Sequence, residues 1–458
     1  MFFWRKPGCL GLTTLILMLM FGTMAQAAAP ATQKAPEPLV IEFWTMSLKP
    51  KFIPYFERLV SDYQKQYPQY RIVWVDFPWD ILQLKLITAI AAGKPPALVH
   101  LSVPWAEEMA RDGLLEPVGP WLTAPAQAIS YTSGALDDLR FHGQIYGFPH
   151  YSNVNVLAYN RKLWQAAGLP EGEQAGPRDM DQLLQMARQI AERTGKPAYG
   201  PALGKIDGFM LQQGLPLIAE GRAVFNSPAH VALIKKLALT YRAGGLFKDK
   251  LFADDNFPAV VDAYLGGRLA LMVSAPTALR RVQTDAPQIY AQTGVFAMPA
   301  GPTGLNDGGW LFHFAIPKGN LAANFPAITQ FARYLTNASN QLAFARQAGV
   351  MPTDLTALNN PYFYGTETVA VRDAATQALQ VAARSMQAAR SLYVAGIDDY
   401  DELRRYLVQA AEAGITGRQD IQLALDQAVR LWNRKLAKIR PHLPATKAGT
   451  LTSKQEAR

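Results

Sequence analysis

Residues 145–169, IYGFPHYSNVNVLAYNRKLWQAAGL, constrain what this chain can fold into more than any other stretch. A Gly-x-Pro turn at residues 147–149 opens the stretch, and an extended apolar run then leads to Tyr159 and Asn160. A helical pattern follows and closes at Gly168, a residue type that commonly ends helices. We therefore expect a strand that crosses between two separately folded bodies.

The first 27 residues have the pattern of a cleavable export signal. Arg5 and Lys6 precede an apolar core at about residues 10–21, and Ala-Gln-Ala at residues 25–27 has the small residues that suit signal peptidase. The core is shorter than the roughly 20 residues of a permanent membrane span, so we expect cleavage after this tripeptide. Cys9 precedes the apolar core, whereas a lipid-anchored signal carries its cysteine just after it, so a periplasmic protein without lipid is expected.

The remaining chain is long enough for two domains. Residues 28–38 look like a flexible leader and residues 442–458 like a flexible tail, which leaves about 400 residues, too many for one core. Hydrophobic residues at 49% and aromatic residues at 10% exclude disorder. Because Cys9 is the sole cysteine, the mature chain would lack thiols, which excludes disulfides, thiolate catalysis and cysteine-based zinc sites.

The formal charge of +9 falls to 9 − 2 = +7 once Arg5 and Lys6 are removed. The basic residues are scattered in small clusters on helical patterns, which is typical of a solvated surface. Nucleic-acid binding would require a continuous basic stripe on a recognisable fold, and the sequence has neither, so no nucleic-acid partner is expected.

Strand-like and helix-like segments alternate in the first part of the chain. Strands are predicted at residues 40–44, 71–77 and 97–102, and helices at residues 53–67, from Asp80 to Gly93, and just before Gly113. This alternation predicts a parallel, doubly wound sheet. Ligands of such sheets bind beyond the carboxyl ends of the strands, here the loops that begin at residues 45, 78 and 103.

The alternation resumes after the crossing. Helices are predicted at residues 179–193, 208–219, 228–243, 322–335, 369–386, 400–412 and 420–438, and strands at residues 267–274 and 309–317. No repeat of fixed period is visible, which disfavours solenoids and propellers.

The chain resembles the family 1 extracellular solute-binding proteins of carbohydrate ABC importers, which include maltose-binding proteins. The resemblance runs from about Val40 to Lys438, and its motifs are YGFP with a following Tyr-Asn and AGL at 146–169, FNSP at 225–228, GRLALM at 267–272, GG at 308–309 leading to AIPKG at 315–319, GVMP at 349–352 and ALDQA at 424–428. Two departures concern Ala97, where the family usually has aspartate, and Asp179-Met180-Asp181, where Thr-Trp-Asp is common. They leave subfamily and ligand open.

The resemblance implies an α/β fold of two lobes, each a doubly wound sheet flanked by helices, hinged with a cleft in between. The boundaries it implies are 39–147 and 301–345 for lobe one, and 148–300 and 346–441 for lobe two. The protein is expected to be a monomer.

Sugars present apolar C–H faces and a belt of hydroxyls, so their sites combine aromatic platforms with planar polar groups. Four tryptophans fall at or beside predicted strand ends on one edge, and we expect them to contact ligand: Trp44, Trp79, Trp105 and Trp310. Trp74 and Trp164, in mid-strand and mid-helix, are assigned to packing.

The polar candidates lie in the same loops and after the hinge proline. They are Ser47, Lys49, Asp80, Glu107, Tyr151 and Asn153, and Gly309 is expected to bring backbone close to the cleft. Simple helix capping is the competing interpretation of Asp80, and solvation that of Glu107. His150 is a further possible contact beside the hinge.

Catalysis, metal binding and cofactor binding have little support in the sequence. There is no Gly-x-Ser-x-Gly elbow, the adjacent carboxylates at 137–138 and 254–255 sit on turns where side chains diverge, and the histidines show no zinc spacing. A secreted glycoside hydrolase is therefore the less favoured alternative to a binding protein.

The expected function is the periplasmic substrate-binding component of an ABC importer. It would capture a sugar or polyol in the interlobe cleft by hinge closure and deliver it to membrane permease subunits, as the resemblance implies. A glycerol-3-phosphate or glycerophosphodiester binder is the runner-up, because Lys49 and helix N-termini could hold an anion. The absence of a dense arginine cluster favours a neutral sugar.

Overall fold

The computed structural model describes residues 37–122, 130–170, 172, 175–304, 306–307, 310–364, 373–386, 388–394, 397 and 400–439. The expected signal, most of the leader, Gly309 and the tail lie outside these residues. From Leu39 onward the chain forms one compact unit.

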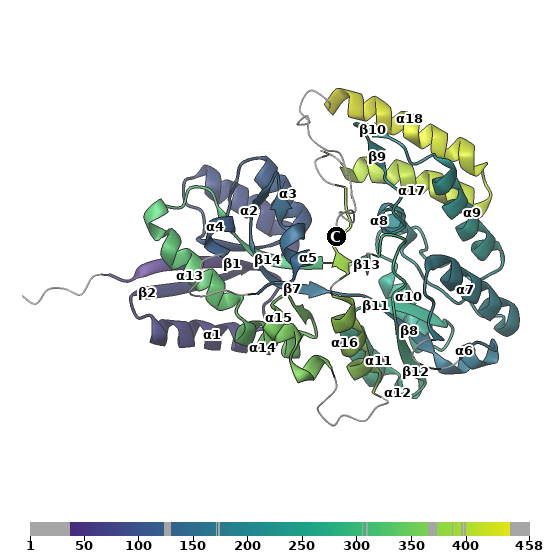
Figure 1. Cartoon of the computed structure of the whole chain (residues 1–458), viewed down its shortest axis with the longest axis horizontal. Helices are drawn as coiled ribbons and strands as arrows, with labels where there is room; N and C mark the ends of the chain where they lie inside the picture. The colour runs from purple at the N-terminus through teal and green to yellow at the C-terminus, as the bar shows by residue number, and fades with distance from the viewer. Residues whose placement is uncertain are drawn as a thin grey trace, which may run out of the picture. The chain divides into compact units, whose positions relative to one another are not determined.

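A seven-stranded sheet organises the first lobe (Figure 1). Its strand order is β15-β7-β14-β3-β1-β2, with β4 beside β14. Strand β1 pairs in parallel with β2 and β3, and β14 is antiparallel to β3 and β7. The bounds are Leu39–Met46 (β1), Tyr70–Phe77 (β2), Leu98–Ser102 (β3), Leu115–Glu116 (β4), Phe148–Asn153 (β7), Trp310–Pro317 (β14) and Met351–Pro352 (β15).

Helices cover both faces of this sheet. Since β1 lies between β2 and β3, right-handed crossovers place α1 and α2 on opposite faces, as Figure 1 shows. The helices of the first lobe are Ile53–Gln66 (α1), Trp79–Ala91 (α2), Val103–Arg111 (α3), Gly119–Leu122 (α4), Ser133–Asp138 (α5), Phe325–Leu335 (α13), Ala338–Ala348 (α14) and Leu355–Leu358 (α15), with short turns at Ala322–Asn324 (η4) and Pro361–Phe363 (η5) and a hairpin of Arg140–Phe141 (β5) and Gln144–Ile145 (β6).

The second lobe is built on a smaller sheet of order β11-β8-β12, namely Leu271–Ser274, Val156–Asn160 and Thr293–Ala297. Tyr199 extends this sheet by parallel bridges to Leu246 and Leu271. Its helices are Arg161–Ala166 (α6), Met180–Thr194 (α7), Ile206–Gln212 (α8), Pro228–Arg242 (α9), Phe257–Leu265 (α10), Pro276–Asp285 (α11), Pro287–Tyr290 (α12), Ala374–Ser385 (α16), Tyr400–Thr416 (α17) and Ile421–Ile439 (α18), with Leu203–Lys205 (η3) before α8. The strands Asn306–Asp307 (β13) and Ala389–Arg390 (β16) pair with each other.

The stretch at residues 145–169 crosses between the two sheets. Strand β7 belongs to the large sheet and β8 to the small one, with only residues 154–155 between them. The chain returns from the small sheet to the large one between β12, which ends at residue 297, and β14, which begins at residue 310. Strand β15, at residues 351–352, also belongs to the large sheet. The lobe boundaries implied by the resemblance remain predictions.

Two predicted elements are corrected. The helix predicted over residues 208–219 ends at Gln212, because Gly214 turns the chain with φ 70°, and residues 218–223 instead form a hairpin of Ile218–Ala219 (β9) and Arg222–Ala223 (β10). The turn of this hairpin, Glu220-Gly221, has positive φ at both residues, as tight hairpins require. The strand predicted from Gly267 begins only at Leu271.

Two apolar clusters fill the interior. One contains Phe43 and Phe331 of the first lobe and extends through the crossing into the second lobe, where it includes residues of α10, α11 and α16. The other, in the second lobe, contains Trp164, which is 1% exposed, and Trp432, which is fully buried and donates its Nε1–H to the carbonyl of Leu403 at 2.7 Å. The packing assignment of Trp164 is confirmed.

Three histidines lie buried in the large sheet: His100 on β3, His150 on β7 and His313 on β14. His100 and His150 face each other, with Nε2 and Nδ1 3.3 Å apart. Burial lowers the pKa of His100 well below 6.5 and lowers the pKa of both His150 and His313 to about 3. The folded protein therefore holds these imidazoles neutral.

We predict that the free energy of unfolding falls as the pH is lowered from about 7.5 to about 5. The unfolded chain takes up protons on these imidazoles near pH 6.5, whereas the folded chain does not, so their stabilising contribution is complete above that pH and is lost below it. Burial raises the pKa of Asp138 to about 6, which acts in the opposite direction, so the test must compare variants.

The measurement is denaturant unfolding at a series of pH values. His150→Phe, which suits a site lined by Phe314 and Phe344, should make the dependence on pH shallower. His142→Gln, at an exposed position, is the matched control and should leave it unchanged. If His150→Phe retained the wild-type dependence, burial of the imidazole would not be its source.

Candidate functional site

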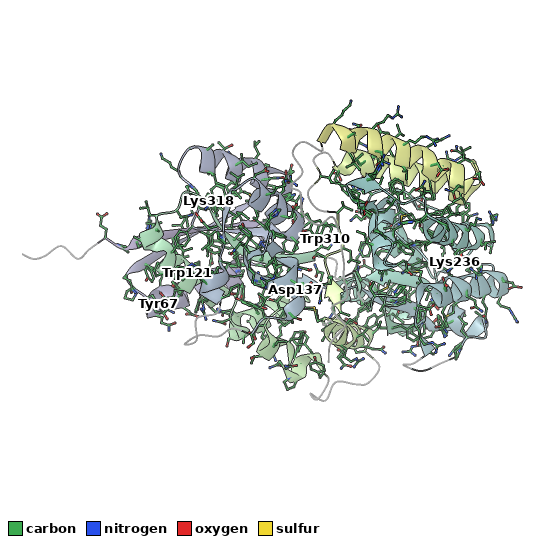
Figure 2. All side chains as sticks on the ribbon, turned by 45° about the horizontal axis from the view of Figure 1, so that its top comes forward. Tyr67, Trp121, Asp137, Lys236, Trp310 and Lys318 are labelled. Carbon is green, nitrogen blue, oxygen red and sulfur yellow. The ribbon has the colours of Figure 1, made fainter. Side chains whose placement is uncertain are left out.

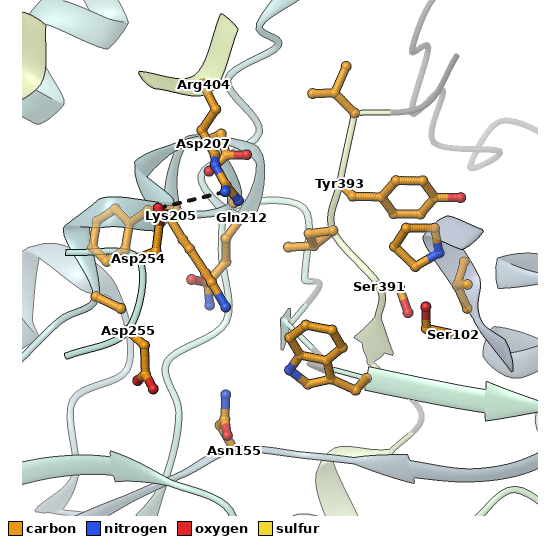
Figure 3. Close-up of a pocket in the computed structure, with 18 of the residues that line it drawn as sticks. Ser102, Asn155, Lys205, Asp207, Gln212, Asp254, Asp255, Ser391, Tyr393 and Arg404 are labelled. Carbon is orange, nitrogen blue, oxygen red and sulfur yellow. Dashed lines mark ion pairs between the residues drawn. The ribbon is translucent and has the colours of Figure 1, made fainter. Parts of the chain in front are cut away.

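A cavity of about 1230 Å³ lies between the lobes (Figure 3). Its walls come from the start of α3, the crossing segment at Asn153 and Asn155, and the region from Tyr199 to α8. The loop before α10, the ends of β11 and β14, and the segment from Ser391 into α17 complete it. Because elements of both sheets line it, a bound molecule would touch both lobes.

Three of the predicted tryptophans lie next to one another, and one of them lines this cavity. Trp310, which is labelled in Figure 2, lines it and is 43% exposed. The Trp79 ring lies 6.1 Å from that of Trp310 and 4.9 Å from that of Trp105, centroid to centroid. Trp79 is itself 39% exposed, so a large apolar surface of its side chain faces solvent. We call these three indoles the indole cluster. Trp79 follows β2, Trp105 follows β3, and Trp310 is the first residue of β14.

Two predicted polar residues also line the cavity. Glu107, on α3, is 8% exposed, and its carboxylate lies 3.7 Å from the guanidinium of Arg111. Asn153 ends β7. Burial raises the pKa of Tyr393, another wall residue, and the neighbouring Glu107 raises it further.

Trp79, Trp105 and the remaining predicted residues that the structure describes lie outside the cavity lining. Trp44 is 8% exposed on β1 and packs against Phe77, and Tyr151 is 9% exposed and stacks on Phe312. Ser47, Lys49 and Asp80 are also absent from the walls of this cavity. All these assignments remain predictions.

Lys49 was expected to contact ligand in the cleft, but it lies beside Trp74. Its ammonium lies 4.4 Å from the ring centre of Trp74, in a separate groove beside α1. The backbone N–H of Lys49 and of Leu48 donate to the carboxylate of Asp76, both at 3.0 Å, which fixes this loop on the end of β2. Trp74 itself stacks between Phe43 and Phe56, so its packing assignment is confirmed.

Sequence reasoning missed the wall formed by the second lobe. Asp207, on α8, is 7% exposed and accepts a hydrogen bond from the hydroxyl of Tyr400 at 2.7 Å. Burial raises the pKa of Tyr400, and the neighbouring carboxylate of Asp207 raises it further. Arg404 pairs with Asp254 at 3.6 Å and with Asp401 at 3.1 Å. The Asp254–Arg404 pair is the dashed line of Figure 3. These partners are far apart in sequence, and the sequence predicted only that helices begin near residues 208 and 400.

Within the described ranges, no group of three or more histidine, cysteine or acidic residues is arranged to hold a metal ion. Among the same residues, no helix combines the length and apolar character that a membrane crossing demands.

A family model for bacterial extracellular solute-binding proteins matches residues 49–342, more than half of the chain. The chain belongs to this family. The predicted resemblance and the two-lobe α/β fold class are thereby confirmed.

Known relatives of this solute-binding protein are distant. A protein of Brucella abortus, assigned as a binding protein by name alone, is 25% identical over 260 residues, which cover 55% of this chain and 61% of that protein. The chain thus spans about three-fifths of the length of the curated relatives it matches first.

Two solved structures are similar over most of the chain. A Synechococcus protein, named by assignment as an oligosaccharide periplasmic-binding protein, is 26% identical with a TM-score of 0.74, covering 87% of this chain and 99% of that one. The sugar-binding protein MalE of Xanthomonas citri is 22% identical with a TM-score of 0.70, covering 89% and 100%. The second likeness shows the fold alone.

We predict that Trp79→Ala and Trp105→Ala change the stability of the ligand-free protein little, because Trp79 is 39% exposed and Trp105 lies only partly buried at the edge of the core. Trp164→Ala is the matched control and should cost about 3–5 kcal/mol, the usual range for emptying a core position. Denaturant unfolding measures all three variants. Equal losses in the three would show that the indole cluster is part of the core.

Proposed function

We propose that this solute-binding protein is the periplasmic substrate-binding component of an ABC importer, and that it captures a saccharide in the cavity between its lobes. The observation that carries the proposal is the exposed indole of Trp310 in the cavity wall, with the indoles of Trp79 and Trp105 packed against one another beside it. Indole faces match the apolar faces of sugar rings, and the amides and carboxylates of the walls match the hydroxyls.

Hinge closure follows from the position of the cavity. The chain passes between the sheets in two residues, 154–155, beside a lining drawn from both lobes. A ligand that touches both walls has more contacts in the closed arrangement and shifts the population towards it. Delivery to membrane permease subunits, as a monomer, completes the proposal and is supported by the family.

A catalytic role is less well supported. The family consists of binding proteins, and a glycosidase needs two opposed carboxylates, one of them free to act as an acid. Glu107 is instead held by Arg111, and Asp207 by Tyr400. The glycerol phosphate alternative relied on Lys49, which lies over Trp74 away from the cavity.

We predict that a saccharide raises the melting temperature of the protein, with a stabilisation of about 2.7 kcal/mol at 100 times Kd. A panel of mono-, di- and trisaccharides, polyols and glycerol-3-phosphate should be screened. Trp79→Ala and Trp105→Ala should then weaken binding of the ligand found by roughly 1–3 kcal/mol in calorimetry. Cleavage of a chromogenic glycoside with no shift from any sugar would favour the enzyme alternative.

We infer from the Ala-Gln-Ala site and from the position of Cys9 that the protein is exported, cleaved and not lipidated. The mature protein should begin at Ala28, or within one or two residues of it, and should carry no lipid. N-terminal sequencing and intact mass of protein from the periplasmic fraction test this. A mass that includes Met1 in a membrane fraction would reverse the assignment.

A further inference from the structure

Lys205 stands in the cavity on the second lobe, and the local structure fixes it there. It ends the turn η3, between Leu203 and Ile206, which are both fully buried. Gly204 packs against the chain so tightly that a Cβ on it would lie 2.1 Å from the carbonyl oxygen of Ala253. The turn is therefore anchored on both sides, while the side chain of Lys205 itself is exposed.

The ammonium of Lys205 meets the other lobe. It lies 5.1 Å from the ring centre of Trp310, on the first strand residue of β14. Figure 3 shows Lys205 and Asn155 pointing into the same space from opposite sides. A cation, an amide and an indole from the second lobe, the crossing segment and the first lobe thus converge.

The acidic residues of the walls all have partners of their own. Glu107 pairs with Arg111, and Asp254 and Asp401 pair with Arg404. Of the remaining four, Glu402 forms an ion pair with Lys435. Asp207, Asp255 and Glu108 accept hydrogen bonds from uncharged groups, namely the hydroxyl of Tyr400, the N–H of Phe257 and the amide of Gln83. None of them forms an ion pair with Lys205 in the described part of the chain.

The basic residues of the walls differ in whether a carboxylate pairs with them. The guanidinium groups of Arg111 and Arg404 are neutralised by the carboxylates named above, and Arg405 lies exposed on α17 in the field of Glu402. Lys205 has only an aromatic face against its charge. A charged side chain that protrudes into a cavity from a rigid turn, without a counter-ion, is suited to a ligand that brings one.

We propose that Lys205 binds a carboxylate of the ligand, so that the substrate class is acidic saccharides, such as those that contain a uronate. The sugar ring would stack on the indole cluster, the ammonium of Lys205 would donate to the carboxylate, and the amide of Asn155 would donate to a neighbouring oxygen. This inference rests on the proposed function, and it replaces the neutral sugar that the sequence alone favoured.

A carboxylate fits this site better than a phosphate. Proteins recognise phosphate esters largely with the fork of arginine, and two of the three arginines in the walls, Arg111 and Arg404, are already held in ion pairs. A single ammonium matches the single charge of a carboxylate.

The test uses Lys205→Met, which keeps an unbranched apolar side chain over the ring of Trp310 and removes the charge. Lys49→Met is the matched control, since Lys49 also lies over an indole but outside the cavity. Calorimetry of the full mature chain should compare oligosaccharides of glucuronate or galacturonate with neutral oligosaccharides of equal length, and with glycerol-3-phosphate and a sugar phosphate.

We expect the wild type to prefer a uronate, with affinity that falls as salt is added. Lys205→Met should weaken uronate binding about tenfold, the effect of one hydrogen bond to a charged group. The variant Lys205→Arg should retain most of the affinity, and Lys49→Met should bind as the wild type does.

Equal wild-type affinity for neutral and acidic sugars, or uronate binding unaltered in Lys205→Met, would overturn the inference while leaving the proposed function intact. Preference for a phosphate ester would overturn the choice of carboxylate. If no saccharide of either kind bound the folded wild type, the proposed function itself would fail.

Discussion

The hydrogen bonding of a few consecutive residues holds this molecule in its arrangement. Strand β7 lies between β14 and β15 in the large sheet, and after two residues β8 lies between β11 and β12 in the small sheet. Almost every backbone group of this stretch is committed to one sheet or the other, so the chain has little freedom except at residues 154–155. The cavity, its two walls and any closing motion depend on that short connection.

The glycine that opens this stretch has a further role in packing. A Cβ on Gly147 would lie 2.1 Å from Cδ2 of His313, so a side chain at this position would collide with a buried imidazole. The turn predicted at Gly-x-Pro is absent, because Phe148 and Pro149 already belong to β7. The lack of a side chain on Gly147 instead lets the start of β7 lie close against β14, and β7 ends at Asn153 in the cavity wall.

Much of the fold could be predicted from the sequence, because apolar periodicity and helix stop signals are local. Strands such as β3 and helices such as α9 lie within one or two residues of their predicted bounds. The errors arose where one residue overrides a pattern: Gly214 ends α8 early, although apolar residues continue to Ala219.

The site was predictable only in part, for a related reason. Tryptophans at strand ends are a local signal, and three of them meet. The wall of the second lobe is assembled from partners such as Asp207 and Tyr400, which are 193 residues apart and share no pattern. Lys205 carries no signal of its own, since its significance comes from its place in the cavity wall and from the lack of an ion pair to it among the described residues.

The C-terminal helices α17 and α18 have a consequence for how the protein is made. Trp432, fully buried, completes the core of the second lobe, and β14 and β15 complete the sheet of the first lobe late in the chain. Neither lobe can therefore finish folding while its early residues emerge from the ribosome. A chain whose native contacts are so distant in sequence folds slowly, and slow folding keeps a polypeptide extended long enough to be carried through a membrane before it becomes compact.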